Sequence, residues 1–183
     1  MNIQFPIRIE NSVGERIIFK SFEPDTHGGR VLIQGFCRKG CGPAMHTHFL
    51  QDEELKVVSG KMAYQILGSA VQEALPGETV LFKRGTPHKF WALDGDLQIE
   101  AIVSPAHSII YFLSAVYKAQ LKSGKAEPDP FDAAYLLTRY ASEYDMPEIP
   151  TFFKRVIFPI TVFIGKILGK YPHFRDAPEP VGK

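Results

Sequence analysis

Short apolar stretches separated by turn residues run through the first hundred positions of the chain. Their β-branched composition or alternation of apolar and polar residues is typical of strands. The stretches cover residues 7–9, 15–19, 30–34, 62–67, 79–82, 90–93 and 97–103, with glycine, asparagine and aspartate between them. Many short strands with glycine-rich turns predict a β-sandwich or barrel. We therefore expect a mainly β fold whose interior can hold one small ligand.

The pattern changes after residue 104, where Ser-Pro ends the last predicted strand. Apolar residues then recur at three- and four-residue steps, which predicts amphipathic helices over 109–121, 131–140 and 153–168. Asp129 before Pro130 is typical of a helix start, with aspartate as the cap and proline in the first turn. The predicted division is a barrel at 1–104 and a helical C-terminal extension at 105–183, packed on the barrel or on a partner subunit.

The third predicted helix contains a very apolar run that raises the question of a membrane. Arg155 and Lys166 enclose only ten residues, whereas a bilayer span needs about 20. We therefore predict no transmembrane span. Binding at a membrane interface remains an alternative, but we interpret the segment as a helix that packs on the barrel or on a second subunit.

Two histidines one residue apart form the densest group of potential metal ligands. In an extended strand, side chains alternate between faces, so His46 and His48 point the same way and Thr47 points outward. A single histidine in a strand is more often an ordinary polar residue than a ligand. Several convergent ligands are needed for a metal site, and His88 provides a third imidazole further along the chain.

A carboxylate follows the two histidines, and its phase in the next apolar stretch identifies it. Glu53 shares a face with Leu55 and Val57, whereas Glu54 lies on the opposite face. The face with Leu55 and Val57 is the expected interior. Glu53 is therefore expected to point inward beside the histidines. The same parity places Gln51 with Glu53.

The arrangement Gly40, His46, His48, Glu53 and Gly60 resembles the first signature motif of the cupin family at every defined position. A second stretch resembles the second cupin motif, with its glycines and histidine at the family's spacing: Gly77, Gly85 and His88. Two positions depart from the family pattern, since Lys83 replaces a proline and Ala92 an asparagine. Neither position is a ligand in the family.

The resemblance implies a cupin double-stranded β-helix, a jelly-roll barrel, followed here by an α-helical extension. It also implies that His46, His48, Glu53 and His88 hold one divalent transition metal, which could be Fe, Zn, Ni, Mn or Cu, because imidazole suits several of these metals. Glu53 is then a candidate catalytic base. The expected function is dioxygenase-like chemistry on a small organic substrate. The alternative is a cupin that binds or senses a small ligand without catalysis.

The composition of the chain limits which partners are expected for the protein. The chain of 183 residues carries a net charge of +1, so we expect no nucleic-acid partner, which normally requires a basic patch. The first residues lack the pattern of a secretory signal, which predicts a cytoplasmic protein. Cys37 and Cys41 are interpreted as free thiols, with a redox pair as the alternative. We expect a homodimer, because exposed barrel strands and apolar tails are usually covered.

Overall fold

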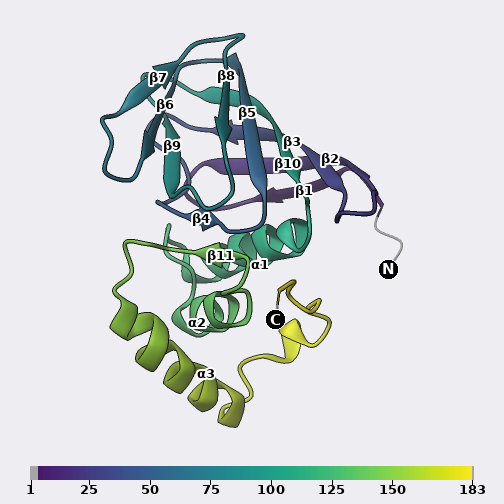
Figure 1. Ribbon diagram of the computed structural model, residues 1–183. Helices are drawn as coiled ribbons and strands as arrows, with labels where there is room; N and C mark the ends of the chain where they lie inside the picture. The colour runs from purple at the N-terminus through teal and green to yellow at the C-terminus, as the bar shows by residue number, and fades with distance from the viewer. Residues whose placement is uncertain (1–3, 183) are drawn as a thin grey trace.

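The computed structural model describes residues 4–182, and most of its strands form a six-stranded sheet packed against a three-stranded sheet (Figure 1). The six-stranded sheet has the order β1 (Ile7–Glu10), β2 (Glu15–Glu23), β3 (Arg30–Cys37), β10 (Leu97–Ser104), β5 (Asp52–Ser59) and β8 (Thr79–Phe82). The three-stranded sheet has the order β7 (Gln72–Ala74), β6 (Met62–Ile66) and β9 (His88–Ala92). All of these pairings are antiparallel. The expected mainly β fold is confirmed.

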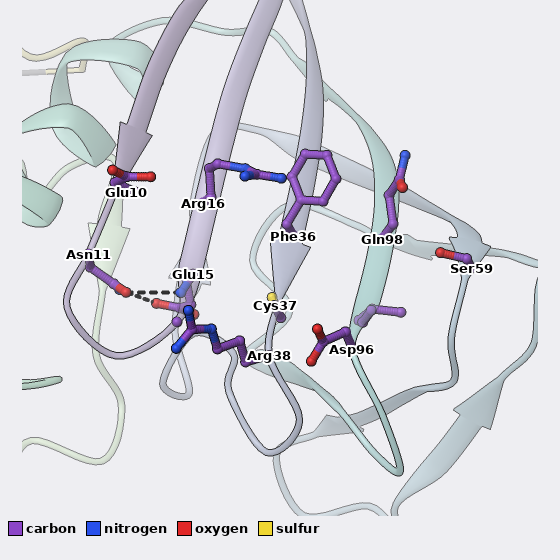
Figure 2. Close-up of a pocket in the computed structure, with 12 residues that line it drawn as sticks. Glu10, Asn11, Glu15, Arg16, Phe36, Cys37, Arg38, Ser59, Asp96 and Gln98 are labelled. Atoms are coloured by element: carbon purple, nitrogen blue, oxygen red, sulfur yellow. Dashed lines mark hydrogen bonds between the residues drawn. The ribbon is translucent and has the colours of Figure 1, made fainter.

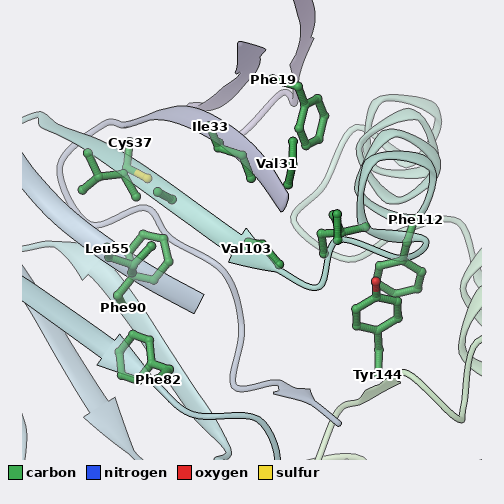
Figure 3. Close-up of a cluster of buried hydrophobic side chains, with 14 of the residues drawn as sticks. Phe19, Val31, Ile33, Cys37, Leu55, Phe82, Phe90, Val103, Phe112 and Tyr144 are labelled. Carbon is green, nitrogen blue, oxygen red and sulfur yellow. The ribbon is translucent and has the colours of Figure 1, made fainter. Parts of the chain in front are cut away.

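Alternation along the strands builds the core between the sheets. On β10, Leu97, Ile99, Ala101 and Val103 are buried, while the residues between them are more exposed. On the neighbouring β5, Leu55 is buried beside them, paired with Ala101. Leu55 and Val103 belong with Phe82 and Phe90 of the other strands to one cluster of buried apolar side chains, part of which Figure 3 shows.

Strand β2 is longer than its sequence pattern predicts. The predicted strand ended at Phe19, but the observed strand continues to Glu23. The pairing with β3 shifts register between Phe19 and Ser21, so that Lys20 is an extra residue on β2. Such a bulge interrupts the period-two alternation, which explains why the sequence pattern ended too early.

The three predicted helices are present as successive layers below the barrel (Figure 1). They are α1 (Ile109–Ser123), α2 (Pro130–Arg139) and a third helix formed by the π-helical turn η1 (Phe153–Ile157) and α3 (Phe158–Ile167), followed by the short η2 (Pro172–Phe174). As predicted, Asp129 caps α2, since its carboxylate accepts hydrogen bonds from the backbone N–H groups of Phe131 and Asp132. Helix α1 lies against the barrel, α2 packs on α1, and α3 packs on α2.

Helix α3 is held in one orientation by contacts on its inner side. Gly165 is buried there, and a Cβ atom at this position would overlap the ring of Tyr171. At the start of the segment, the Lys154 ammonium lies 2.8 Å from a carboxylate oxygen of Asp145. No helix within residues 4–182 has the length and apolar character required to cross a membrane.

Candidate metal centre

Three histidines and one glutamate meet at one end of the barrel. His48 lies in β4 (Thr47–His48), Glu53 in β5 and His88 at the start of β9, while His46 forms an isolated β-bridge with His88. Two backbone hydrogen bonds form this bridge, with N–O distances of 2.9 and 2.8 Å. One potential ligand atom from each of the four side chains lies within 4.8 Å of all the others. The structure thus brings together all four residues that the sequence analysis selected.

Backbone carbonyls orient two of the imidazoles. Nδ1 of His46 lies 2.8 Å from the Ala44 oxygen, and Nδ1 of His88 lies 2.8 Å from the Thr86 oxygen. A carbonyl oxygen can only accept, so Nδ1 carries a proton in both rings, and Nε2 is the nitrogen that each ring directs into the cluster. Nε2 of His88 is 2.9 Å from Oε2 of Glu53. Such outer hydrogen bonds are typical of metal-binding histidines.

The donor set fits a divalent transition metal. Imidazole nitrogens and carboxylate oxygens bind such an ion at about 2.0–2.2 Å, so two ligands on opposite sides lie up to about 4.4 Å apart. The four ligand atoms observed here lie within 4.8 Å of one another, and this upper limit is within a few tenths of an ångström of that value. The ring of His48 has no hydrogen bond to any described residue, and its buried Nδ1 is unsatisfied. A ring nitrogen of His48 is therefore available to a cation.

The protonation states of the cluster also suit a cation. Burial, reinforced by the neighbouring imidazoles, lowers the pKa of His46 to about 3, and burial lowers the pKa of His48. Burial alone would raise the pKa of Glu53, but the hydrogen bond from His88 and the charges of the histidines outweigh it and lower this pKa to about 2. The lowered pKa values of His46 and His48 favour the neutral imidazoles that can bind a metal, and the lowered pKa of Glu53 favours the ionised carboxylate.

Aromatic rings cover the inner side of the cluster. The ring of Phe82 stacks on His88 with centroids 3.9 Å apart, and the ring of Tyr144 lies perpendicular to that of His48. His48 and His88 are consequently buried, whereas His46 and Glu53 are half-buried. A small molecule would therefore approach from the side of His46 and Glu53.

One expectation for this region was wrong. Thr47 was predicted to point outward, away from the histidines, but this outer position is buried. The reason is that β11 (Tyr144–Asp145), from the helical extension, pairs with β4 and places Asp145 opposite Thr47. The alternation of faces is as predicted, but the outer face is covered by a part of the chain almost a hundred residues away.

Gln51 belongs to a buried polar network and not to the set of cation donors. Its amide nitrogen lies 3.0 Å from Oε2 of Glu143 and 3.2 Å from the Tyr144 hydroxyl. Glu143 is fully buried and also accepts hydrogen bonds from the Ser108 hydroxyl and, at its other oxygen, from the backbone N–H of Val181. Glu143 and Tyr144 were not predicted from the sequence, because they lie outside both cupin-like motifs and after the end of α2, where no periodic pattern identifies them.

A separate cavity of about 330 Å³ lies at the opposite end of β5 and β10, near Ser59 and Gln98 (Figure 2). Its wall includes Glu15, whose pKa is raised by burial and which is hydrogen-bonded to Asn11. Cys37 also lines it, and burial raises the pKa of its thiol to about 12. Both cysteines are free, as interpreted from the sequence. A thiol with such a pKa is a poor nucleophile.

Comparison with known proteins supports the fold. No family profile matches the sequence, and no curated protein matches it. Among solved structures, KdgF from a Halomonas species aligns with a TM-score of 0.50 and 20% identity, covering 58% of this chain and 99% of that one. A cupin-like protein from Thermotoga maritima aligns with a TM-score of 0.44 and 17% identity, over 57% of this chain and 80% of that one.

A Klebsiella pneumoniae protein with a double-stranded β-helix domain aligns with a TM-score of 0.41 and 21% identity, over 57% of this chain and 80% of that one. These similarities concern the fold. The resemblance of the sequence motifs points the same way as the alignment with KdgF. The chain has the double-stranded β-helix fold of the cupins, with a helical extension at its C-terminal end.

Proposed function

We propose that this protein is a mononuclear metalloprotein in which His46, His48, Glu53 and His88 hold a divalent transition metal and present it to a small organic substrate for dioxygenase-like chemistry. The observation that carries the proposal is the convergence of these four donors within 4.8 Å, in protonation states suited to a cation. The fold supports it, because small barrels of this class can enclose a ligand.

A bound transition metal would supply Lewis acidity or redox chemistry. The three imidazoles and the Glu53 carboxylate would leave further coordination positions for a substrate with two neighbouring oxygen atoms. Oε2 of Glu53 is engaged with His88, which leaves Oε1 to accept a proton from an acidic substrate held beside it. The rings of Phe82 and Tyr144 would exclude water from the inner side.

Elemental analysis of untagged protein tests the metal site. We expect near-stoichiometric metal in the wild type and its loss in a His46→Ala, His48→Ala variant. A His107→Ala, His173→Ala variant is the matched control, because it removes two imidazoles that lie outside the cluster. Wild-type protein that binds no transition metal, even after incubation with each candidate ion, would contradict the proposal.

Oxygen uptake tests the chemistry separately. Iron-loaded protein would be assayed with catechols, flavonols and diketones, beside the His46→Ala, His48→Ala variant. Uptake that depends on substrate and on the histidines supports dioxygenase-like activity. A metal-loaded protein that binds members of this panel and converts none of them would contradict it.

Non-catalytic binding or sensing of a small ligand is the second candidate, and one observation favours it. The polar groups beside His48, namely Gln51 and Tyr144, are hydrogen-bonded to each other and to the Glu143–Ser108 network. Because Gln51 and Tyr144 already have hydrogen-bond partners, Glu53 is the group of the cluster that remains for acid–base chemistry. Saturable binding to the metal-loaded protein with unchanged ligand on recovery is the result that this candidate predicts.

A further inference from the structure

Helix α3 and its flanking residues carry an apolar surface that no described part of the chain covers. Eight large apolar residues between positions 152 and 168 are exposed, and Phe163 and Ile167 retain 64% and 70% of their accessible surface. The eight residues, called here the α3 face, are Phe152, Phe153, Val156, Ile160, Phe163, Ile164, Ile167 and Leu168. Their three- and four-residue spacing places them along one side of the helix.

The α3 face points outward because the opposite side of the helix packs against the rest of the protein. The opposite side of the helix contacts α2, with Gly165 buried against Tyr171. Lys154 is paired with Asp145 at the beginning of the segment. As Figure 1 shows, α3 is the outermost layer, on the side of α2 away from the barrel. Turning the α3 face inward would require these inner contacts to break.

The segment that carries the α3 face has basic residues and no acidic ones, although one of its cations, Lys154, is paired with Asp145 from outside it. Residues 149–175 contain five of the 21 basic residues of the chain and none of its 20 acidic residues. The rest of the chain therefore has 16 basic and 20 acidic residues, a net negative charge. Arg155 and Lys166 are both exposed, and on a helical projection they lie together along one edge of the apolar face. An apolar face bordered by cations matches the boundary between acyl chains and anionic headgroups.

A second copy of this chain fits the α3 face less well. In a two-fold contact between two α3 faces, the cations of both helices would lie close together. Neither 149–175 segment has an acidic residue that could pair with them. Contact between the α3 face and a different surface of another copy would be heterologous, so it would form a ring or an open chain of molecules and not a two-fold dimer. Charge complementarity therefore favours a lipid surface.

We propose that the α3 face binds the surface of an anionic membrane, with the helix lying in the interfacial plane and Arg155 and Lys166 at the headgroups. The helical segment Phe153–Ile167 has 15 residues, which corresponds to a length of about 22 Å. This length suits a helix that lies on a bilayer. The binding places the cupin barrel near the membrane, at the far side of α1 and α2.

Co-sedimentation of the full chain with vesicles tests the proposal. The probes are vesicles of phosphatidylcholine alone and vesicles that also contain phosphatidylserine. We expect binding to the anionic vesicles, at least about tenfold stronger than to the neutral ones because two cations each contribute about fivefold. Added salt should weaken it. Absence of binding to the anionic vesicles, or equal binding to both, would overturn the proposal.

Two variants separate the apolar and the charged contributions. Phe163→Ser with Ile167→Ser should lower vesicle affinity at least about tenfold, and Arg155→Gln with Lys166→Gln should abolish the preference for anionic lipid. The control is Leu67→Ser with Val71→Ser, two apolar residues of the barrel that are also exposed, at 49% and 51%. All four side chains of the test variants are exposed, so the circular dichroism and metal content should stay those of the wild type.

The same samples distinguish a protein partner from a lipid one. Light scattering without vesicles would reveal a dimer, and comparison with the Phe163→Ser, Ile167→Ser variant would show whether the α3 face holds it together. A dimer that this variant dissociates, combined with no vesicle binding by the wild type, would overturn the membrane proposal in favour of self-association.

Discussion

The phenol ring of Tyr144 is perpendicular to the imidazole of His48, with ring centroids 5.4 Å apart and planes at 88°. The two residues are also opposite each other in the β4–β11 pair. Tyr144 also stacks on Phe112 of α1, with centroids 4.1 Å apart (Figure 3). The helical extension therefore takes part directly in burying a candidate metal ligand.

Replacement of Tyr144 should affect both folding and the candidate metal centre. Tyr144→Ala is expected to lower the free energy of unfolding by about 3–5 kcal/mol, as for other buried aromatic residues, and to weaken metal binding because His48 loses its lateral support. Tyr144→Phe keeps the ring and should cost about 1–2 kcal/mol, from the lost hydroxyl partner of Gln51 and Ser108. Urea unfolding and competition for zinc would measure the two effects. Equal losses in both variants would show that the ring contact contributes nothing.

The carboxylate of Glu143 joins three parts of the chain. It accepts hydrogen bonds from Gln51 before β5, from Ser108 before α1, and from Val181 near the C-terminus. Glu143→Ala leaves these buried donors without a partner, so we expect a loss of about 3 kcal/mol or more. Glu143→Gln keeps the shape and one acceptor and should lose less. Denaturant unfolding of both variants is the measurement, and an Ala variant as stable as the Gln variant would contradict the prediction.

The turn before His88 is tied to β5 through Asp52. Its carboxylate accepts a hydrogen bond of 2.8 Å from the backbone N–H of Arg84 and pairs with the Arg84 guanidinium. The ammonium of Lys83, at the position where cupins usually have proline, is 3.7 Å from the same carboxylate. Hydrogen bonds from Arg84, first from its side chain and then from its backbone, lower the pKa of Asp52 to about 2.

This lowered pKa predicts how stability depends on pH. Asp52 has a lower pKa in the folded protein than in the unfolded chain. The ionised carboxylate therefore adds to the free energy of unfolding above the usual pKa of 3.8, and this contribution is lost as the pH falls to about 2. Asp52→Asn should therefore destabilise the protein at pH 7, by less than about 1 kcal/mol because the pair is largely exposed. The difference from the wild type should shrink in urea titrations below about pH 4. A difference that stays constant with pH would refute this assignment.

The contact between Gly165 and Tyr171 predicts that α3 tolerates no larger residue on its inner side. An added Cβ atom would overlap three atoms of the Tyr171 side chain. Although alanine favours helices, Gly165→Ala should be destabilising by about 1–3 kcal/mol because of this overlap. Gly95→Ala is the control, since a Cβ atom there meets nothing within 4 Å. Thermal unfolding of the two variants is the measurement, and a Gly165→Ala variant as stable as the control would show that Tyr171 moves aside freely.

Local patterns predicted the strands and helices well where one periodicity continued without interruption. The strand at Thr79–Phe82 and the cap at Asp129 agree with the structure in detail. The extra residue at Lys20 broke the alternation and shortened the prediction for β2. The phase of Glu53 relative to Leu55 and Val57 was sufficient to identify the carboxylate of the cluster, because β5 keeps its alternation from Glu53 to Val57.

The sequence by itself determined the fold class and the four clustered side chains, because strand alternation and motif spacing act over a few residues along the chain. Only the tertiary structure decided what surrounds them. The burial of Thr47, the ring of Tyr144 on His48, and the engagement of Gln51 by Glu143 all join positions about a hundred residues apart. The outward direction of the α3 face has the same origin, because an amphipathic pattern gives the faces of a helix but not which of them will find a partner.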